Sequence, residues 1–504
     1  MGRSRSGIVN ELATLIGIAA ARWGDARYVT FDAEPFGFVR LANLAGRFAA
    51  GLAAKGVNRG DRVVLYLPNG WQWVVAYHAL ARMAAVVVPA NILLSAAEVR
   101  YVAVDAGARA LIVPDDRAEL LGEAAELLVT PGTTPVAISF DALLAAEPLA
   151  PAAVSPDDLL AISYTSGTMG RPKGVMQTHG NVAASIVHTA TTHVRHEHDR
   201  IWSALPFAHV YGNVVLNTCF LSGARLFTAA RFDARAALAD IAKHRITLFE
   251  GVPTMYYQLL AHPALATALL SSLTRCTVGG QTMPVAKLDA VAMRFGCPLL
   301  ELWGMTELSG PATSHSPYWP RRHGSIGLPF PGTEVRLRDL GDPSRDAAPG
   351  EAGELTVRGP LVTQGYWNRP EATAEAIDTA GWLATGDIAT RDAHGYLHII
   401  DRKKDMILTA GYNVYPAELE RVIAMHGDVA MVAVAGFPDE EKGELAHAFV
   451  VRRAGSALTA DALLAHCRQH LAAYKVPRGI HFVDDLPKTS SGKIMRRALA
   501  LPPT

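Results

Sequence analysis

Short apolar runs alternate with helical patterns in the first quarter of the chain, and this alternation limits the fold more than any other feature. The sequence predicts strands at Arg62–Leu67, Val86–Val88 and Ala110–Val113. Helical patterns lie between them, at Trp71–Met83 and after the capping box that begins at Ser95. Strands that alternate with helices pair in parallel within one sheet. We therefore predict an α/β fold.

In the rest of the chain, the pattern of apolar and polar residues changes twice. A second α/β run covers about residues 159–302, and β-patterned runs with Gly, Pro and Asp between about 324 and 400 predict a small β-barrel-like subdomain. A charged run, Asp401–Asp405, precedes a final α+β segment. We predict a large N-terminal domain over residues 1–400, with two α/β sheet subdomains and the β-barrel-like one, and a small C-terminal α+β domain over 401–504.

Charge and cysteine content exclude several classes of function. Lys plus Arg and Asp plus Glu are both 47, so no global basic field is available to bind nucleic acid. No apolar run reaches the roughly 18 residues that a membrane helix requires. The four cysteines are far apart and form no C-x-x-C pair, which favours a reducing, cytoplasmic location. We expect a monomer or homodimer.

A loop rich in Gly, Ser and Thr at Tyr164–Gly174 is the strongest chemical signal. Glycines let backbone N–H groups approach phosphate oxygens, hydroxyls donate further hydrogen bonds, and Lys173 supplies a cation. Lys173 precedes Gly174 and is not followed by Ser or Thr, so the loop is not that of a P-loop kinase or GTPase.

Further motifs follow this loop in a fixed order. They are Gly279-Gly280, Glu301–Gly310, Gly381–Asp387, Tyr396–Arg402, Gly411–Pro416 and Pro487–Ile494. In order and spacing the chain resembles the adenylate-forming (AMP-binding) ligase superfamily, acyl-CoA synthetase type, over about residues 25–497. The resemblance implies a ligase that uses ATP and Mg²⁺ to convert a carboxylic acid to an acyl-adenylate with release of pyrophosphate, and then transfers the acyl group to CoA.

The resemblance also implies which residues bind ATP. The β- and γ-phosphates would be bound by Thr165, Ser166, Gly167, Thr168, Met169, Gly170 and Lys173, where Met169 replaces the usual Ser or Thr. Adenine would lie against Gly279, Gly280, Glu301, Leu302, Trp303, Gly304 and Met305. Thr306 would contact the α-phosphate, and Glu307 with Thr165 would bind the metal. Asp387 would accept the ribose hydroxyls, with Arg402 beside it.

Lys493 is the expected catalytic cation, because a carboxylate must approach an anionic phosphoryl centre and an ammonium offsets the repulsion. The resemblance implies that His209, Thr306 and Glu307 complete the catalytic set. It also implies that the C-terminal domain is mobile and swings about a hinge at Asp401. Gly411, Tyr412 and Asn413 would then shape the CoA tunnel.

The acyl pocket suggests an uncharged acyl group. Its expected lining is His209, Val210, Tyr211, Gly212, Val215, Gly280, Gly304, Met305 and Pro311. Residues 206–217 hold no Asp or Glu, so an amino acid is disfavoured, although Glu250 is able to reach the pocket. The lining holds no Arg, so malonate is disfavoured too.

We expect a medium- or long-chain fatty acid, with an aryl acid of the benzoate or cinnamate type as the alternative. A carrier-protein thiol in place of CoA is a second alternative, which would require a separate partner protein. A binding protein without catalysis is disfavoured, because Lys493 and Glu307 are both present.

Overall fold

The computed structural model describes residues 11–31, 33–165, 172–410, 412–439, 441–487 and 494–501. These residues group into two compact units. The first contains Met1–Glu334 and Val357–Leu383, and the second contains Val335–Thr356 and Ala384–Thr504. No helix among the described residues is long and apolar enough to cross a membrane.

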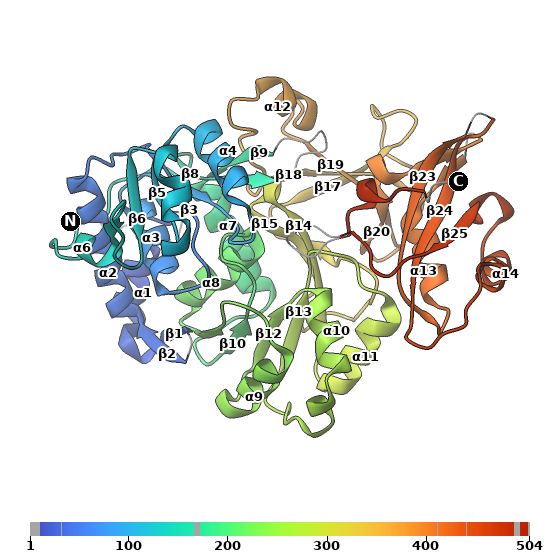
Figure 1. Ribbon diagram of the computed structural model, residues 1–504, viewed down its shortest axis with the longest axis horizontal. Coiled ribbons are helices and arrows are strands. Elements are labelled where there is room, and N and C mark those ends of the chain that lie inside the picture. The colour runs from blue at the N-terminus through green and yellow to red at the C-terminus, as the bar shows by residue number, and fades with distance from the viewer. Residues whose placement is uncertain are drawn as a thin grey trace. The chain divides into compact units, whose positions relative to one another are not determined.

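One sheet of the first unit contains the predicted early strands, side by side (Figure 1). Its order is β7 (Ile138–Ser139), β6 (Leu127–Thr130), β5 (Ala108–Ile112), β3 (Arg62–Leu65), β4 (Val86–Pro89), β8 (Leu159–Thr165) and β9 (Lys173–Thr178). The pairs from β7 to β8 are parallel, and β8 pairs with β9 antiparallel. Its helices are α2 (Phe38–Ala54), α3 (Trp71–Arg82), α4 (Ala96–Ala106), α5 (Ala118–Leu121) and α6 (Phe140–Leu143).

A second sheet completes the α/β layers of this unit. Its order is β16 (Leu328–Pro329), β15 (Gly310–Ser314), β14 (Leu299–Met305), β13 (Arg275–Val278), β12 (Leu248–Gly251), β10 (Arg200–Ser203), β11 (Arg225–Thr228), β1 (Tyr28–Phe31) and β2 (Glu34–Gly37). The other helices of this unit are α1 (Leu15–Trp23), α7 (His179–Thr192), α8 (Val210–Ser222), α9 (Ala234–His244), α10 (Pro253–Ala261), α11 (Val285–Phe295) and α12 (Pro370–Ala376). The predicted α/β fold is confirmed.

Local sequence signals account for several of these boundaries. Ser95 caps α4 through a reciprocal capping box with Glu98, as the sequence predicts. Helix α3 begins directly after the Pro68–Gly70 turn and buries every side chain from Trp73 to Ala81. A helix buried on all sides lies inside the protein core rather than at its surface.

The second unit contains the remaining sheets. One has the order β17 (Glu334–Asp339), β18 (Gly353–Arg358), β19 (Leu383–Arg391) and β20 (Leu397–Arg402), an open sheet where the sequence suggests a barrel-like one. The other has the order β22 (Tyr412–Val414), β21 (Ile407–Thr409), β24 (Gly443–Arg452) and β23 (Val429–Asp439), with β25 (Gly479–Phe482) paired to β24. Helices α13 (Pro416–Ala424) and α14 (Ala460–His470) pack with it.

Most of the β-rich run thus groups with the C-terminal residues. The division into domains at residue 400, and the hinge at Asp401, stay predictions, since Asp401 lies inside the second compact unit.

Two helical glycines offer a matched test of the packing in the first unit. A Cβ at Gly51 in α2 would overlap Leu143 of α6, whose Cα would be 2.8 Å away, whereas a Cβ at Gly17 in α1 would meet nothing within 4 Å. Gly51→Ala should destabilise the unit by about 1–3 kcal/mol. Gly17→Ala should stabilise it by about 0.5–1 kcal/mol. Calorimetric unfolding of both variants measures this, and equal shifts of the same sign would contradict the packing described.

Candidate active site

The expected phosphate loop connects two strands of the first sheet. Thr165 at the end of β8 pairs with Lys173 at the start of β9. Ser166, Gly167, Thr168, Met169 and Gly170 lie outside the described residues. The Lys173 ammonium is 5.1 Å from the ring centroid of Tyr366, a cation–π distance that orients the cation.

Glu307 is held by residues that the sequence pattern does not reveal. It lies in the short 3₁₀ helix η5 (Thr306–Leu308) and is 8 % exposed. The Tyr366 hydroxyl donates to Glu307 Oε1 at 3.0 Å, and the Thr363 N–H donates to the Glu307 carbonyl at 2.9 Å. Burial, with the nearby Glu307 charge, raises the pKa of the Tyr366 phenol, so this hydroxyl remains a donor.

Gln177 of β9 connects the two sheets at this point. Its Nε2 donates to the Thr306 carbonyl at 3.0 Å, and its Oε1 accepts from the Ser163 hydroxyl at 2.9 Å. The β8–β9 hairpin and η5 are therefore fixed to each other. A Thr hydroxyl and a Glu carboxylate both supply oxygen, the donor type that Mg²⁺ prefers, so Thr165 and Glu307 fit the expected metal.

The expected adenine residues come from neighbouring strands of the second sheet. Gly279 and Gly280 follow β13, and residues Glu301 to Met305 form the end of β14. A Cβ at Gly279 would overlap the Leu302 side chain, so only glycine permits this approach.

Glu301 is the most strongly perturbed acid in this group. It is 9 % exposed, and Oε1 accepts from the Gly324 N–H at 2.8 Å. Burial raises the pKa of its carboxyl to about 8, opposed by the Gly324 hydrogen bond and assisted by the charge of Asp289. Glu301 is therefore largely neutral at pH 7.

Several of the expected acyl residues lie at the N-terminus of α8. His209 caps this helix, with Nδ1 accepting from the Tyr211 N–H at 3.3 Å. A Cβ at Gly310 would lie 3.0 Å from Val214 and 3.8 Å from the Val210 carbonyl.

On the other side of this group, a Cβ at Gly304 would lie 2.6 Å from the Pro311 Cα. Strand β15 therefore contacts α8 at Gly310 and β14 at Pro311. Val215 is fully buried in the core, and its contact with substrate stays a prediction, as does that of Gly212.

Glu250, the acid that the sequence leaves open, is not available to pair with an ammonium group. Its Oε1 accepts from Arg195 Nη2 at 2.5 Å, and both side chains are fully buried. Its Oε2 accepts from the hydroxyls of Tyr211, at 3.1 Å, and Thr277. The carboxylate is thus neutralised by a partner from the protein itself.

The second unit holds the remaining expected residues. Asp387 Oδ1 accepts from Arg402 Nε at 2.7 Å, across the β19–β20 pair. Asp401 accepts from the Ala417 N–H at 2.7 Å and lies 3.5 Å from Arg496. Tyr412 stacks on Tyr474 with centroids 4.7 Å apart, and Asn413 is exposed beside it. Lys493 and Gly411 lie outside the described residues.

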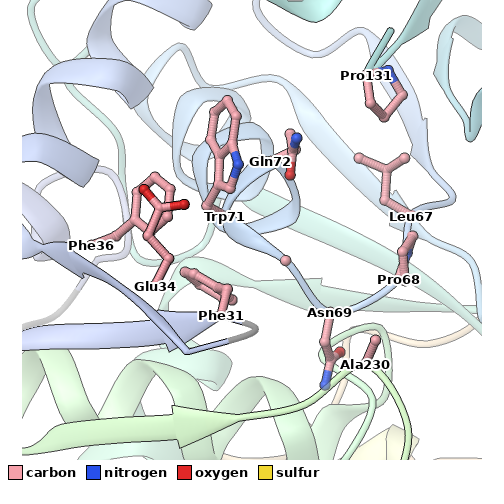
Figure 2. A pocket seen from close by; sticks show the side chains of 11 residues that line it. Phe31, Glu34, Phe36, Leu67, Pro68, Asn69, Trp71, Gln72, Pro131 and Ala230 are labelled. Atoms are coloured by element: carbon pink, nitrogen blue, oxygen red, sulfur yellow. The ribbon is translucent and has the colours of Figure 1, made fainter.

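A cavity of about 340 Å³ in the first unit lies away from all of these residues. Figure 2 shows Phe31, Glu34, Phe36 and Trp71 on one side of it and Asn69 below. Asn69 also accepts from the Phe207 N–H at 2.8 Å and donates to the Leu205 carbonyl at 2.9 Å. Asn69 therefore fixes the segment that leads to His209, a contact that the motifs do not predict.

The raised pKa of Glu301 gives a test with a defined sign. The folded protein binds this proton more tightly than the unfolded chain, whose carboxyl has the ordinary value of 4.5. The stabilisation is complete below pH 4.5 and is lost as pH rises through about 8. Glu301→Gln should therefore leave the Tm unchanged near pH 4.5 and raise stability at pH 8.5 by about 1 kcal/mol or more.

The exposed Glu351→Gln is the matched control and should show no such pH-dependent difference. Thermal unfolding from pH 4.5 to 9 measures both variants. A constant difference between wild type and Glu301→Gln across that range would contradict the burial of Glu301.

Comparison with known proteins agrees with this geometry. The AMP-binding enzyme family model matches residues 18–367, and the AMP-binding enzyme C-terminal domain model matches residues 418–493. A feruloyl-CoA synthase from Amycolatopsis is 39% identical over 91% of this chain and 92% of its own. A long-chain-fatty-acid–CoA ligase from Bacillus subtilis is 35% identical over 97% of this chain and 94% of its own.

A solved structure extends the comparison to ligands. The o-succinylbenzoate CoA synthetase of Bacillus subtilis, in complex with ATP and magnesium ion, is 29% identical, with a TM-score of 0.86 over 96% of this chain and 99% of its own. Two family models, full-length relatives and the shared fold thus agree with the motifs. The chain belongs to the AMP-binding enzyme family and is an ATP-dependent acid–CoA ligase that uses Mg²⁺.

Proposed function

We propose that this ligase activates a carboxylic acid whose acyl group is apolar and carries no charge. The observation that carries the proposal is the Arg195–Glu250 pair, because it neutralises the charged side chains beside Tyr211. An ammonium or a second carboxylate entering there would be desolvated without a partner, at a cost of several kcal/mol. Apolar acyl groups avoid this cost.

We assign the first step, the formation of the acyl-adenylate, as follows. The acid's carboxylate oxygen attacks the α-phosphorus of ATP, and the bond to pyrophosphate breaks. Thr165 and Glu307 would hold Mg²⁺, which neutralises phosphate charge when bound. Support for Glu307 comes from its burial and its bond from Tyr366, which fix the direction of its carboxylate.

The other nucleotide roles follow the same assignment. Thr306 would contact the α-phosphate. Lys173 and the loop before it would bind the outer phosphates. The adenine would be bound by Gly279, Gly280 and Glu301 to Met305. Asp387 and Arg402 would hold the ribose, and their ion pair supports this because it leaves the carboxylate in a fixed position. Lys493 would offset the charge between the carboxylate and the α-phosphate.

The second step would follow a swing of the C-terminal domain about Asp401. The CoA thiol then attacks the acyl carbon and AMP leaves, with Gly411, Tyr412 and Asn413 lining the tunnel and His209 at the acyl carbon. The bonds from Asp401 to Ala417 and Arg496 support this, because they anchor one side of the hinge. The cytoplasmic location stays a prediction.

Product analysis tests the proposed substrate class. Mass spectrometry should detect acyl-CoA and AMP when ATP, Mg²⁺ and CoA are supplied with benzoate, ferulate, hexanoate or decanoate. Malonate and phenylalanine should give no product, because each places a charge beside Tyr211. Acyl-CoA from malonate or phenylalanine would contradict the proposed acyl class. Acyl-adenylate without thioester would indicate that the acyl acceptor is a carrier-protein thiol and not CoA.

Glu307→Gln tests the metal assignment in the same assay. Loss of one carboxylate charge should lower acyl-adenylate formation by about 10²-fold. Glu371→Gln, an exposed carboxylate on α12, is the matched control and should retain wild-type activity. Unchanged adenylate formation by Glu307→Gln would remove Glu307 from the metal site.

A further inference from the structure

Tyr211, an expected lining residue of the acyl site, belongs to a buried polar network. Glu250 on β12 and Thr277 on β13 are register partners, so their side chains extend from the same face of the sheet. Both are fully buried, and Tyr211 from α8 meets them with 5 % of its surface exposed. The Tyr211 hydroxyl lies 2.6 Å from Thr277 Oγ1 and 3.1 Å from Glu250 Oε2.

This network occupies a defined level of the sheet. Gly251 and Val278 form the next row of the same parallel pair, and Gly279 and Gly280 follow at the carboxyl end. Ligands of open α/β sheets bind at the carboxyl ends of the strands. The Glu250–Thr277 row, which Tyr211 meets, therefore lies one residue before the carboxyl ends of β12 and β13.

Arg195 makes this layer rigid. Its Nη2 pairs with Glu250, and its Nη1 donates to the Thr218 hydroxyl of α8. If the Tyr211 ring swung aside, Glu250 would lose a hydrogen bond while still buried, which is unfavourable. Burial also raises the pKa of the Tyr211 phenol well above 10, so the hydroxyl stays protonated and in place.

A long acyl chain that extended past Tyr211 would require an apolar path through this layer. Burial of a methylene is favourable only when its surroundings are apolar. Methylenes pushed between Tyr211 and the Arg195–Glu250 pair would instead separate buried charges from their partners. A single ring or a short chain ends above the layer and avoids this cost.

We infer that Arg195 and Glu250 are positioning residues that fix Tyr211 as the floor of the acyl site, so that the enzyme prefers compact acids, aryl or short-chain, to long-chain ones. This inference rests on the proposed function and names the acyl class within it. It selects the aryl alternative over the medium- or long-chain fatty acid that the motifs favour.

The first test compares kcat/KM of wild type for ferulate, benzoate, hexanoate, decanoate and palmitate. Ferulate, benzoate or hexanoate should exceed palmitate by at least about 10²-fold, since several methylenes would be excluded. Palmitate used as well as ferulate would overturn the inference and leave the proposed function intact. No acyl-CoA from any of these acids would overturn the proposed function itself.

The second test removes the ion pair. In Arg195→Met/Glu250→Met two apolar side chains replace the buried charges, an exchange that proteins often tolerate without loss of stability. The ratio of kcat/KM for decanoate to that for benzoate should rise by about 10-fold or more, because Tyr211 loses its hydrogen bond to Glu250 and keeps only its contact with Thr277. An unchanged ratio in a folded variant would overturn the inference.

Two single variants separate positioning from general damage. Thr218→Val removes a contact of Arg195 but leaves the Arg195–Glu250 pair and the bond from Tyr211 to Glu250 in place, and should lower Tm without changing the ratio. Glu250→Gln keeps an acceptor for Tyr211 but removes the counter-charge of Arg195, so it should lower Tm and keep the wild-type ratio. If both variants shifted the ratio as much as the double variant, the effect would come from loosened packing, and the positioning role would be wrong.

Discussion

The hydrogen bond from Gln177 to the Thr306 carbonyl joins the two sheets of the first unit where the chemistry is expected. Lys173 enters from β9, and Glu307 lies in the turn that follows β14. Gln177 lies two pleat repeats after Lys173 on the same strand. Its side-chain amide therefore fixes the strand that carries Lys173 relative to the turn that carries Glu307. Thr363 and Tyr366 then hold Glu307 from a third segment. The position of Lys173 relative to Glu307 depends on this hydrogen bond, because the two residues are more than a hundred residues apart in the sequence.

Local signals made much of this fold predictable. The capping box at Ser95, the turn before Trp71 and the apolar strands all act over a few residues, and each appears where the pattern indicates. The glycine at position 279 is explained in the same way, because Gly279 lies so close to Leu302 that only glycine fits there. Such residues can be recognised in the sequence because the physical requirement applies to a single position.

Other parts of the site could not be read in this way. Gln177, Tyr366 and Asn69 act through hydrogen bonds to segments far along the chain, and an isolated Gln, Tyr or Asn has no local signature. Glu250 was visible as a buried acid near the pocket, but its partner Arg195 was not, since pairing depends on how β12 and the loop after α7 meet. The grouping of β17 and β18 with the C-terminal residues has the same origin, because strand pairing decides it and composition does not.

The Arg195–Glu250 pair also has a consequence for chemistry in changing conditions. The pair is net neutral, and the Tyr211 phenol beside it keeps its proton well above pH 10 because burial opposes ionisation. Bulk ions are excluded from a fully buried pair, so salt screens it little. Ionic strength therefore has little effect on the contacts that hold Tyr211, and its phenol stays protonated at neutral pH. If Tyr211 forms the floor of the acyl site as inferred, the selectivity that it imposes does not vary with the salt content of the cell.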